Sequence, residues 1–291
     1  MKFKAIEANQ DQVKVTNACQ ILGVSRSGYY AWRRRKPSAR KQRDGDLRVQ
    51  IKVIWEQSKK LYGSPKIHAA LQDRGETVGR KRVARLMREA GIRGRGPRRK
   101  RVRTTQSDTS HPVQPNHLNR DFKADQPNQK WLTDITYIET REGVLYLAGV
   151  MDLFGRKIVG LAMADHMRTA LVESALKMAQ TQRRPDRGLL HHSDRGSQYT
   201  SRAYQDRLGE MGAVSSMSRR GDCLDNAPME SFWATLKREC ADHVFESRQA
   251  ARNAIFSYVM GFYNRTRRHS ALGYLSPADY EHAFERHFLC A

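Results

Sequence analysis

The pattern of apolar and polar residues between residues 131 and 217 predicts five strands and two helices. Three segments alternate between two faces or run apolar, and only short turns separate them, which is typical of an antiparallel meander. Short apolar strands and helical spacing then alternate, so a mixed sheet with helices on its faces is expected. The strands are expected at 131–139, 144–152, 157–164, 188–192 and 213–217, and the helices at 169–182 and 199–211.

Two further helices are expected beyond residue 225. One opens at Asp225-Asn226 and runs to about residue 240, and the other fills 248–264. The second ends in a run of basic and titratable residues that includes Arg268. Cations there suit the dipole of the helix end, and they suit a DNA backbone equally well, so both interpretations stay open.

The first 92 residues have two helical patterns. Helices at 17–22 and 26–34, separated by Gly23, form a helix-turn-helix pattern. A second helical unit over 46–92 includes a helix with one apolar face and one basic face. Such a helix suits recognition in the major groove, and a solvated basic face is the alternative. Its basic residues largely off the apolar stripe are Arg80, Lys81, Arg85 and Arg88.

Charge separates the chain into two parts. The net charge is +23, and residues 1–130 carry 32 basic and 11 acidic residues, which is +21 of that total. A strongly basic segment favours a polyanionic partner, and nucleic acid is the first candidate. Residues 93–128 lose the helical pattern and are expected to form a linker, polar at its rear. Its basic front can track phosphates through Arg98, Arg99, Lys100 and Arg101.

Three carboxylates stand in different predicted settings. Asp134 lies on a strand, Asp194 follows a strand, and Glu230 lies near the start of a helix, with 59 and 35 residues between successive acids. Singly, they have ordinary explanations as a turn residue or as compensation of a helix dipole. If they converge, they can hold two divalent metal ions and activate a nucleophile against a phosphodiester. Asp152 on a central strand is interpreted as structural, and Asp225 as a cap.

These motifs occur in an order that resembles a known family. The chain resembles the downstream-frame proteins of two-frame bacterial insertion-sequence transposases, within the superfamily of DDE transposases and retroviral integrases. The likeness covers nearly the whole chain. It is carried by Trp131, Asp134-Ile135-Thr136-Tyr137, His192-Ser193-Asp194-Arg195-Gly196-Ser197-Gln198-Tyr199, Asp225-Asn226-Ala227, Glu230, Lys237, Tyr263-Asn264, Arg268-His269 and Ser276-Pro277.

The resemblance implies a ribonuclease-H-like fold and a specific chemistry. Asp134, Asp194 and Glu230 would be the catalytic metal ligands, for two Mg²⁺ ions that Mn²⁺ can replace. The enzyme would cleave DNA at the element end and join the freed 3′-hydroxyl to a second site. Implied partners are the terminal inverted repeats, target DNA, further copies of the chain, and the upstream-frame protein as fusion or partner. The residues expected to contact DNA are Lys237, Arg80, Lys81, Arg85, Arg98, Arg99, Lys100, Arg101, Asn226 and Arg268.

Two other function classes remain open from sequence: a DNA-binding regulator with a degenerate core and a structure-selective nuclease of the same fold. The presence of all three acids argues against the first, and the basic helical front argues against the second. No apolar run approaches 18 residues and the four cysteines lack metal-ligand spacing, so an intracellular protein is expected. The resemblance implies a cytoplasmic, nucleoid-associated bacterial protein. The expected units are 1–45, 46–92, 93–128, 129–245 and 246–291.

Overall fold

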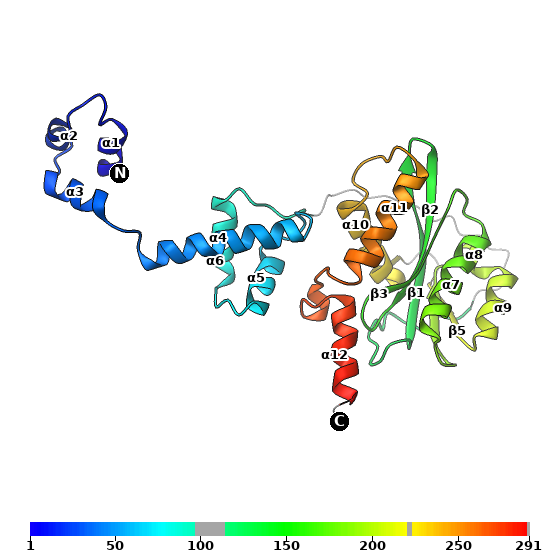
Figure 1. Ribbon diagram of the computed structural model, residues 1–291. Helices are drawn as coiled ribbons and strands as arrows, with labels where there is room; N and C mark the ends of the chain where they lie inside the picture. The colour runs from blue at the N-terminus through cyan, green and yellow to red at the C-terminus, as the bar shows by residue number, and fades with distance from the viewer. Residues whose placement is uncertain (97–113, 220–222, 290–291) are drawn as a thin grey trace.

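The computed structural model describes residues 1–96, 114–219 and 223–289 (Figure 1). Three short helices begin the chain: α1 (Lys2–Ala8), α2 (Val15–Ile21) and α3 (Arg26–Arg34). They bury Ile6, Cys19 and Tyr29 in a small core of their own. Gly23 takes a left-handed conformation, φ +58°, between α2 and α3, and so makes the expected break. The helix α1 was not expected from the sequence.

A second helical unit consists of α4 (Ala39–Gln57), α5 (Ser64–Asp73) and α6 (Arg80–Glu89). Leu47, Ile51 and Ile54 of α4 pack on Val83 and Leu86 of α6, which confirms the apolar stripes. Helix α4 is continuous through residues 45 and 46, where a boundary between two units was expected. The break in the chain lies instead before α4, whose first turn is capped by the Ser38 hydroxyl accepting from the Lys41 backbone N–H at 3.3 Å.

The five predicted strands form one mixed sheet in the order β3-β2-β1-β4-β5. Strands β1 and β2 pair antiparallel, as do β2 and β3, whereas β4 runs parallel to β1 and β5 parallel to β4. This topology confirms the expected meander followed by α/β units. The strands are β1 (Lys130–Thr140), β2 (Gly143–Asp152), β3 (Lys157–Ala164), β4 (Leu190–Ser193) and β5 (Val214–Met217).

Helices cover both faces of the sheet (Figure 1). On one face, α7 (Thr169–Arg183) and α9 (Arg202–Glu210) pack on Trp131, Ala148 and Val150. On the other, α10 (Ala227–Glu239) and α11 (Arg248–Phe256) pack on Leu132, Ile138 and Leu147. Alternate residues of β1 therefore serve two cores, and the face that carries Asp134 is the α10 face.

Two predicted helices are interrupted. The segment expected at 199–211 is split at Ser201 into α8 (Ser197–Thr200) and α9, because Ser201 is extended and its hydroxyl caps α9. The segment expected at 248–264 is α-helical only as α11 and continues as a π-helix, η2 (Ser257–Tyr263). The remaining elements are η1 (Cys223–Asn226), η3 (Ser270–Leu272) and a terminal helix that was not expected, α12 (Pro277–Leu289).

From residue 114 onward, where the structure describes it, the predicted linker packs against the sheet. Leu118 is 1% exposed, and the Ser216 hydroxyl on β5 accepts backbone N–H bonds from His117 and Leu118 at 2.9 and 3.3 Å. Residues 114–128 therefore run as an ordered strap across the sheet edge rather than as a solvated linker. The basic residues Arg98, Arg99, Lys100 and Arg101 lie outside the described residues.

The second helical unit contacts two segments of the C-terminal half of the chain. Tyr62 donates from its hydroxyl to the Thr266 carbonyl at 3.1 Å and accepts from the Arg268 backbone N–H at 2.9 Å. Arg95 pairs with Asp242 at 3.1 Å. These contacts hold the second helical unit against the segments that follow α10 and η2. In the part of the chain that the structure describes, no helix has the length and apolarity to cross a bilayer.

Candidate active site

The pairing register places two of the three acids at the same level of the sheet. Residues of β1 pair in parallel with residues of β4 that lie 60 positions later, up to Leu132 and His192. Asp134 and Asp194 have the same separation and lie just beyond these last partners. Strand β4 ends at Ser193, so the edge of β1 is open from this point and both carboxylates lie at its rim.

Asp134 is held by the helix packed above it. The indole Nε1 of Trp233 on α10 donates to Asp134 Oδ2 at 3.1 Å. Gly149, the β2 partner of Asp134, makes this possible, since a Cβ there would lie 2.9 Å from Trp233 Cη2. The indole ring of Trp233 therefore packs on Gly149 of β2, and its N–H reaches Asp134 on the neighbouring strand β1.

Asp194 is fixed by the turn that follows β4. Its Oδ1 accepts from the Gly196 backbone N–H at 2.9 Å, which closes a short side-chain turn before α8. Glu230 lies in the first turn of α10 and is exposed. Its carboxylate has no hydrogen-bond or ion-pair partner among the described residues. It is therefore the one acid of the three that is free to reorient.

The three acids interact electrostatically. Burial raises the pKa of Asp134 well above its usual range, and the nearby Asp194 and Glu230 raise it further. Burial also raises the pKa of Asp194 and that of Glu230. Within the described ranges no Lys or Arg pairs with any of them. An acidic cluster without a protein counter-ion has the chemistry of a divalent-cation site.

The ligand arrangement is incomplete in this conformation. Within the described residues, no group of three or more His, Cys, Asp or Glu side chains is close enough to hold a metal ion. Asp134 and Asp194 are positioned by hydrogen bonds, whereas Glu230 is not. The donor set suits a hard cation, because carboxylate oxygens are the preferred ligands of Mg²⁺.

Two residues near the acids were expected to contact DNA. Lys237 shares a face of α10 with Glu230, as the spacing predicts, and its Nζ lies 4.8 Å from the Tyr137 ring centre. Burial lowers the pKa of Lys237, and the neighbouring Asp134 and Glu139 raise it. Asn226 is 5% exposed and donates to the Thr133 carbonyl at 3.1 Å. The structure thus places Asn226 as a brace between η1 and β1, away from the surface.

The basic residues of the helical unit have different settings. Arg80 and Lys81 at the start of α6 are exposed. Arg85 is bound instead by Asp44 of α4 at 2.8 Å and by Glu89 at 2.6 Å. Arg268 pairs with Asp73 of α5 at 2.5 Å and donates to the Tyr274 carbonyl. Arg85 and Arg268 therefore join parts of the protein in this conformation.

Asp225 has a larger role than the cap that the sequence suggested. It is fully buried and accepts from Asn116, from Arg120 and from the backbone and guanidinium of Arg219, at 2.7–3.0 Å. These charge-assisted bonds lower the pKa of Asp225. Asp225 thus links the strap and Arg219 to η1, the turn that precedes α10 and Glu230. In the sequence, the only sign of this role is the basic pair Arg219-Arg220 nearby.

A buried histidine braces the strand that leads to Asp194. The Ser216 hydroxyl accepts two backbone N–H bonds from the strap, so its own hydrogen is available to His192 Nδ1, 2.9 Å away. His192 Nε2 then donates to Ser218 at 3.1 Å. Burial lowers the pKa of His192 to about 4, consistent with this neutral form. His192 therefore links β4 to β5 through two serine hydroxyls.

Asp152 is also structural, as the sequence suggested. It is buried, pairs with Arg183 at 3.0 Å and accepts from the backbone of Asn128 and Phe154. Arg183 reaches Glu281 of α12 at 2.8 Å. This network ties the start of β1 and the end of β2 to α7 and α12.

Comparisons with known proteins agree with this architecture. The model of the HTH-like domain matches residues 41–101, and models of the integrase core domain match 124–223 and 211–277. A chain of the simian T-cell lymphotropic virus intasome in complex with PP2A regulatory subunit B56 gamma has a TM-score of 0.47 at 16% identity. That alignment covers 74% of this chain and 70% of the viral one.

Two curated relatives are much closer in sequence. The insertion element IS600 uncharacterized 31 kDa protein of Shigella sonnei is 46% identical over 92% of this chain and 98% of its own length. Transposase InsF for insertion sequence IS3A of Escherichia coli (strain K12) is 40% identical, over 97% of this chain and 98% of that protein. The chain therefore belongs to the insertion-sequence transposases, the family in which an HTH-like domain precedes an integrase core domain.

Proposed function

We propose that the chain cleaves and joins DNA phosphodiesters through Asp134, Asp194 and Glu230. The observation that supports this assignment most directly is the electrostatic one: Asp194 and Glu230 raise the pKa of the buried Asp134, and within the described residues no Lys or Arg forms an ion pair with any of the three acids. Such an arrangement costs stability, and a bound divalent cation removes that cost.

The proposed cofactor is Mg²⁺, with Mn²⁺ as a substitute, at two positions. When bound, two such ions supply electrostatic stabilisation of the attacking and leaving oxygens of an in-line displacement. Asp134 and Asp194 are held ready as ligands by Trp233 and Gly196. Glu230 completes the set by reorientation of its exposed side chain. Lys237, on the same face of α10 as Glu230, contacts a phosphate of the bound DNA strand.

The proposed reaction has two steps of the same kind. Water first attacks the phosphodiester at the element end and releases a 3′-hydroxyl. That hydroxyl then attacks a phosphodiester of a second DNA, so that one bond forms as another breaks. The chain's contribution is to position the acids and to hold both DNA segments through its basic front.

A strand-transfer assay tests the proposal. The purified chain is supplied with pre-cleaved DNA ends, a second DNA and Mg²⁺, and Glu230→Gln is compared with Glu210→Gln, a change at an exposed glutamate of α9. Joining is expected in the native chain and in Glu210→Gln but not in Glu230→Gln, with DNA affinity alike in all three. Joining by Glu230→Gln would remove Glu230 from the site, and cleavage without joining would favour a nuclease.

We also propose that the chain acts as a homo-oligomer on DNA and cooperates with an upstream-frame protein. Joining requires two or more DNA segments to be held at once, and the +23 charge of the chain needs neutralisation for copies to associate. Light scattering should give a monomer without DNA and a larger complex with element-end DNA. Of the expected units 1–45, 46–92, 93–128, 129–245 and 246–291, the first boundary is moved before α4, and the strap at 114–128 is assigned to the core instead of the linker.

A further inference from the structure

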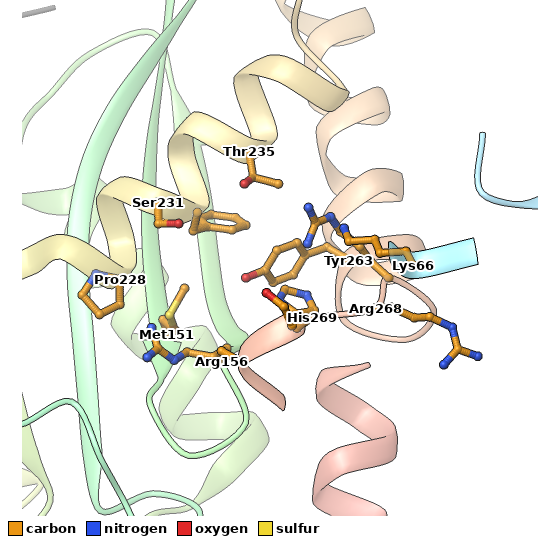
Figure 2. A pocket seen from close by; sticks show the side chains of 13 residues that line it. Lys66, Met151, Arg156, Pro228, Ser231, Thr235, Tyr263, Arg268 and His269 are labelled. Atoms are coloured by element: carbon orange, nitrogen blue, oxygen red, sulfur yellow. The ribbon is translucent and has the colours of Figure 1, made fainter. Parts of the chain in front are cut away.

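A second site lies on the side of α10 that faces away from the acids. A cavity of about 290 Å³ opens between α10, the segment after η2, the β2–β3 turn and α5 (Figure 2). On α10, Ser231 and Thr235 line this cavity, whereas Glu230 and Lys237 belong to the acid face. Residues four and seven apart share a helix face, so Ser231 and Thr235 lie on one side of α10, and Glu230 and Lys237 lie on another.

The walls of the cavity are basic. Four cationic residues and one histidine line it, and they come from three separate parts of the chain. Two of them already have carboxylate partners: Arg267 forms bonds of 2.7 and 2.8 Å to Glu239, and Arg268 pairs with Asp73. The five residues are Lys66, Arg156, Arg267, Arg268 and His269.

The other two cations have no counter-ion. Within the described parts of the chain, neither Arg156 nor Lys66 has a carboxylate within ion-pair distance. Both are partly buried: burial lowers the pKa of Arg156, and burial together with Arg267 lowers the pKa of Lys66 to about 8. The Lys66 ammonium lies 5.2 Å from the Tyr62 ring centre, and Glu239 acts on it only through space. Desolvated cations without a carboxylate at bonding distance are costly, which indicates that an anion belongs here.

His269 is a third unsatisfied group. Its Nε2 is buried and has no hydrogen-bond partner among the described residues, while its ring packs edge-on against Tyr263. A buried polar atom left unpaired costs about 1–3 kcal/mol. Burial and the nearby Arg267 and Lys66 lower the pKa of His269 to about 3, so the ring is neutral and cannot add to the charge.

The donors that face the cavity match a phosphate group. A guanidinium presents a planar fork suited to phosphate oxygens, an ammonium adds a point charge, and the Ser231 and Thr235 hydroxyls can donate as well. The cavity is larger than one phosphate, so it has room for an adjoining sugar. We propose that this pocket binds a backbone phosphate of the DNA strand whose reacting phosphodiester lies at the three acids.

This inference rests on the proposed function and adds a coupling to it. Lys66 comes from α5, whereas Arg156 comes from the β2–β3 turn and Ser231 from α10. The pocket is complete only while the helical unit is docked on the core through Tyr62 and Arg268. A phosphate bound there strengthens that docking, and it fixes α6 relative to the acids.

The test compares variants that each lose one positive charge. Arg156→Gln and Lys66→Gln remove the two unpaired cations, and Arg202→Gln removes an arginine of α9 that is 95% exposed. Affinity for element-end DNA is measured by fluorescence anisotropy at several salt concentrations without Mg²⁺. Each pocket variant should lose roughly tenfold in affinity, with the slope of log K against log salt reduced by about one, and the control should change little.

Several outcomes would contradict the proposal that the pocket binds a DNA phosphate. An unchanged salt slope in both pocket variants, or an equal loss in Arg202→Gln, would exclude a specific phosphate contact. Stabilisation of the native chain by inorganic phosphate, with DNA affinity of Arg156→Gln unchanged, would show that the pocket takes a free phosphate instead. Because the readout is binding, it is independent of the chemistry: if Asp134→Asn still joined DNA, the acid assignment would fail while the pocket result stood.

Discussion

The indole N–H of Trp233 on α10 donates a hydrogen bond to Asp134 on β1, at 3.1 Å, from directly above the backbone of Gly149. The bond joins the helix that carries Glu230 to the strand that carries Asp134. It also favours the ionised form of Asp134 against burial and the two neighbouring acids, which raise its pKa. The ionised form of this carboxylate is therefore favoured by the Ile135 backbone N–H and by one aromatic side chain, Trp233.

Trp233→Phe tests that dependence. The ring volume is largely kept, whereas the hydrogen bond to Asp134 is lost, so strand transfer should fall by about tenfold. The pKa of Asp134 should rise further, which moves the acid limb of the pH–rate profile to higher pH. DNA affinity should stay unchanged. Trp55→Phe is the matched control, because Trp55 Nε1 also donates a hydrogen bond, to the Arg93 carbonyl at 3.0 Å, in the helical unit. Equal losses in both variants would contradict the assignment.

Gly149→Ala should act on the same bond from below. The added methyl would lie 2.9 Å from Trp233 Cη2 and 3.2 Å from Met229 Cε, so the indole must move. We expect a loss of stability of about 1–3 kcal/mol and a fall in strand transfer. Gly209→Ala in α9 is the control, since its Cβ meets nothing within 4 Å. Urea denaturation separates the two variants, and a Gly149→Ala protein of native stability and activity would show that the indole has room to shift.

The sheet and the surroundings of the acids could be predicted because their signals are local. Period-two alternation in 131–139 places Asp134 on one face, and the run that ends at Asp194 is a short buried strand. Pro228 marks the start of the helix with Glu230. The antiparallel meander follows from two turns that are too short for any other connection.

Contacts between distant residues could not be predicted from such patterns. Arg85 looks available on a helical wheel, yet Asp44, 41 positions earlier, binds it. Asp225 looks like a cap, but its partners include Arg120, 105 positions away. The strap at 114–128 has a polar composition, and distant residues such as Ser216 and Asp225 bind its backbone and side chains. The π-helix after α11 likewise has no local signal.

The acid cluster should respond to metal in its stability. Without a cation, the raised pKa of Asp134 means that the folded state binds a proton more tightly than the unfolded state, so ionisation at neutral pH destabilises the fold. Mg²⁺ should therefore raise the Tm by a few degrees. Asp134→Asn should raise the Tm in the absence of Mg²⁺ and abolish the Mg²⁺-dependent rise. Asp165→Asn, at an exposed aspartate after β3, should behave like the native chain in thermal melts. A Tm of Asp134→Asn that still rose with Mg²⁺ would move the metal elsewhere.

Substitutions in helix α6 should distinguish residues that contact DNA from residues that stabilise the fold. Arg80 and Lys81 are exposed, so changing both to Gln should weaken DNA binding and reduce the salt slope by about two, with the fold intact. Arg85→Gln should instead lower the urea midpoint, because it removes one of the two guanidinium groups that bind Asp44. Anisotropy and urea titrations on the same samples give both readouts. Loss of stability in the double variant, or loss of salt slope alone in Arg85→Gln, would reverse these roles.

The end of α10 predicts a specific loss of stability in acid. Glu239 is bound by Arg267 and by the Tyr258 hydroxyl, and these bonds, chiefly those to Arg267, lower its pKa to about 2 against burial. A carboxyl group whose pKa is lower in the folded state than its ordinary 4.5 stabilises the fold fully above pH 4.5. That contribution, up to about 3 kcal/mol, is lost as the pH falls from 4.5 toward 2, because the unfolded state takes up the proton first.

Glu239→Gln removes this contribution and leaves Arg267 buried without its partner, at a cost of about 3–5 kcal/mol at neutral pH. The gap in unfolding free energy between the native chain and Glu239→Gln should therefore narrow as the pH is lowered through 4.5. Glu246→Gln breaks an exposed pair with Arg141 and should cost less than about 1 kcal/mol at every pH. Urea denaturation of the three proteins from pH 7 downward measures the gaps. A gap that stayed constant across this range would show that Glu239 keeps an ordinary pKa in the folded protein, and that its bond to Arg267 does not favour the charged form.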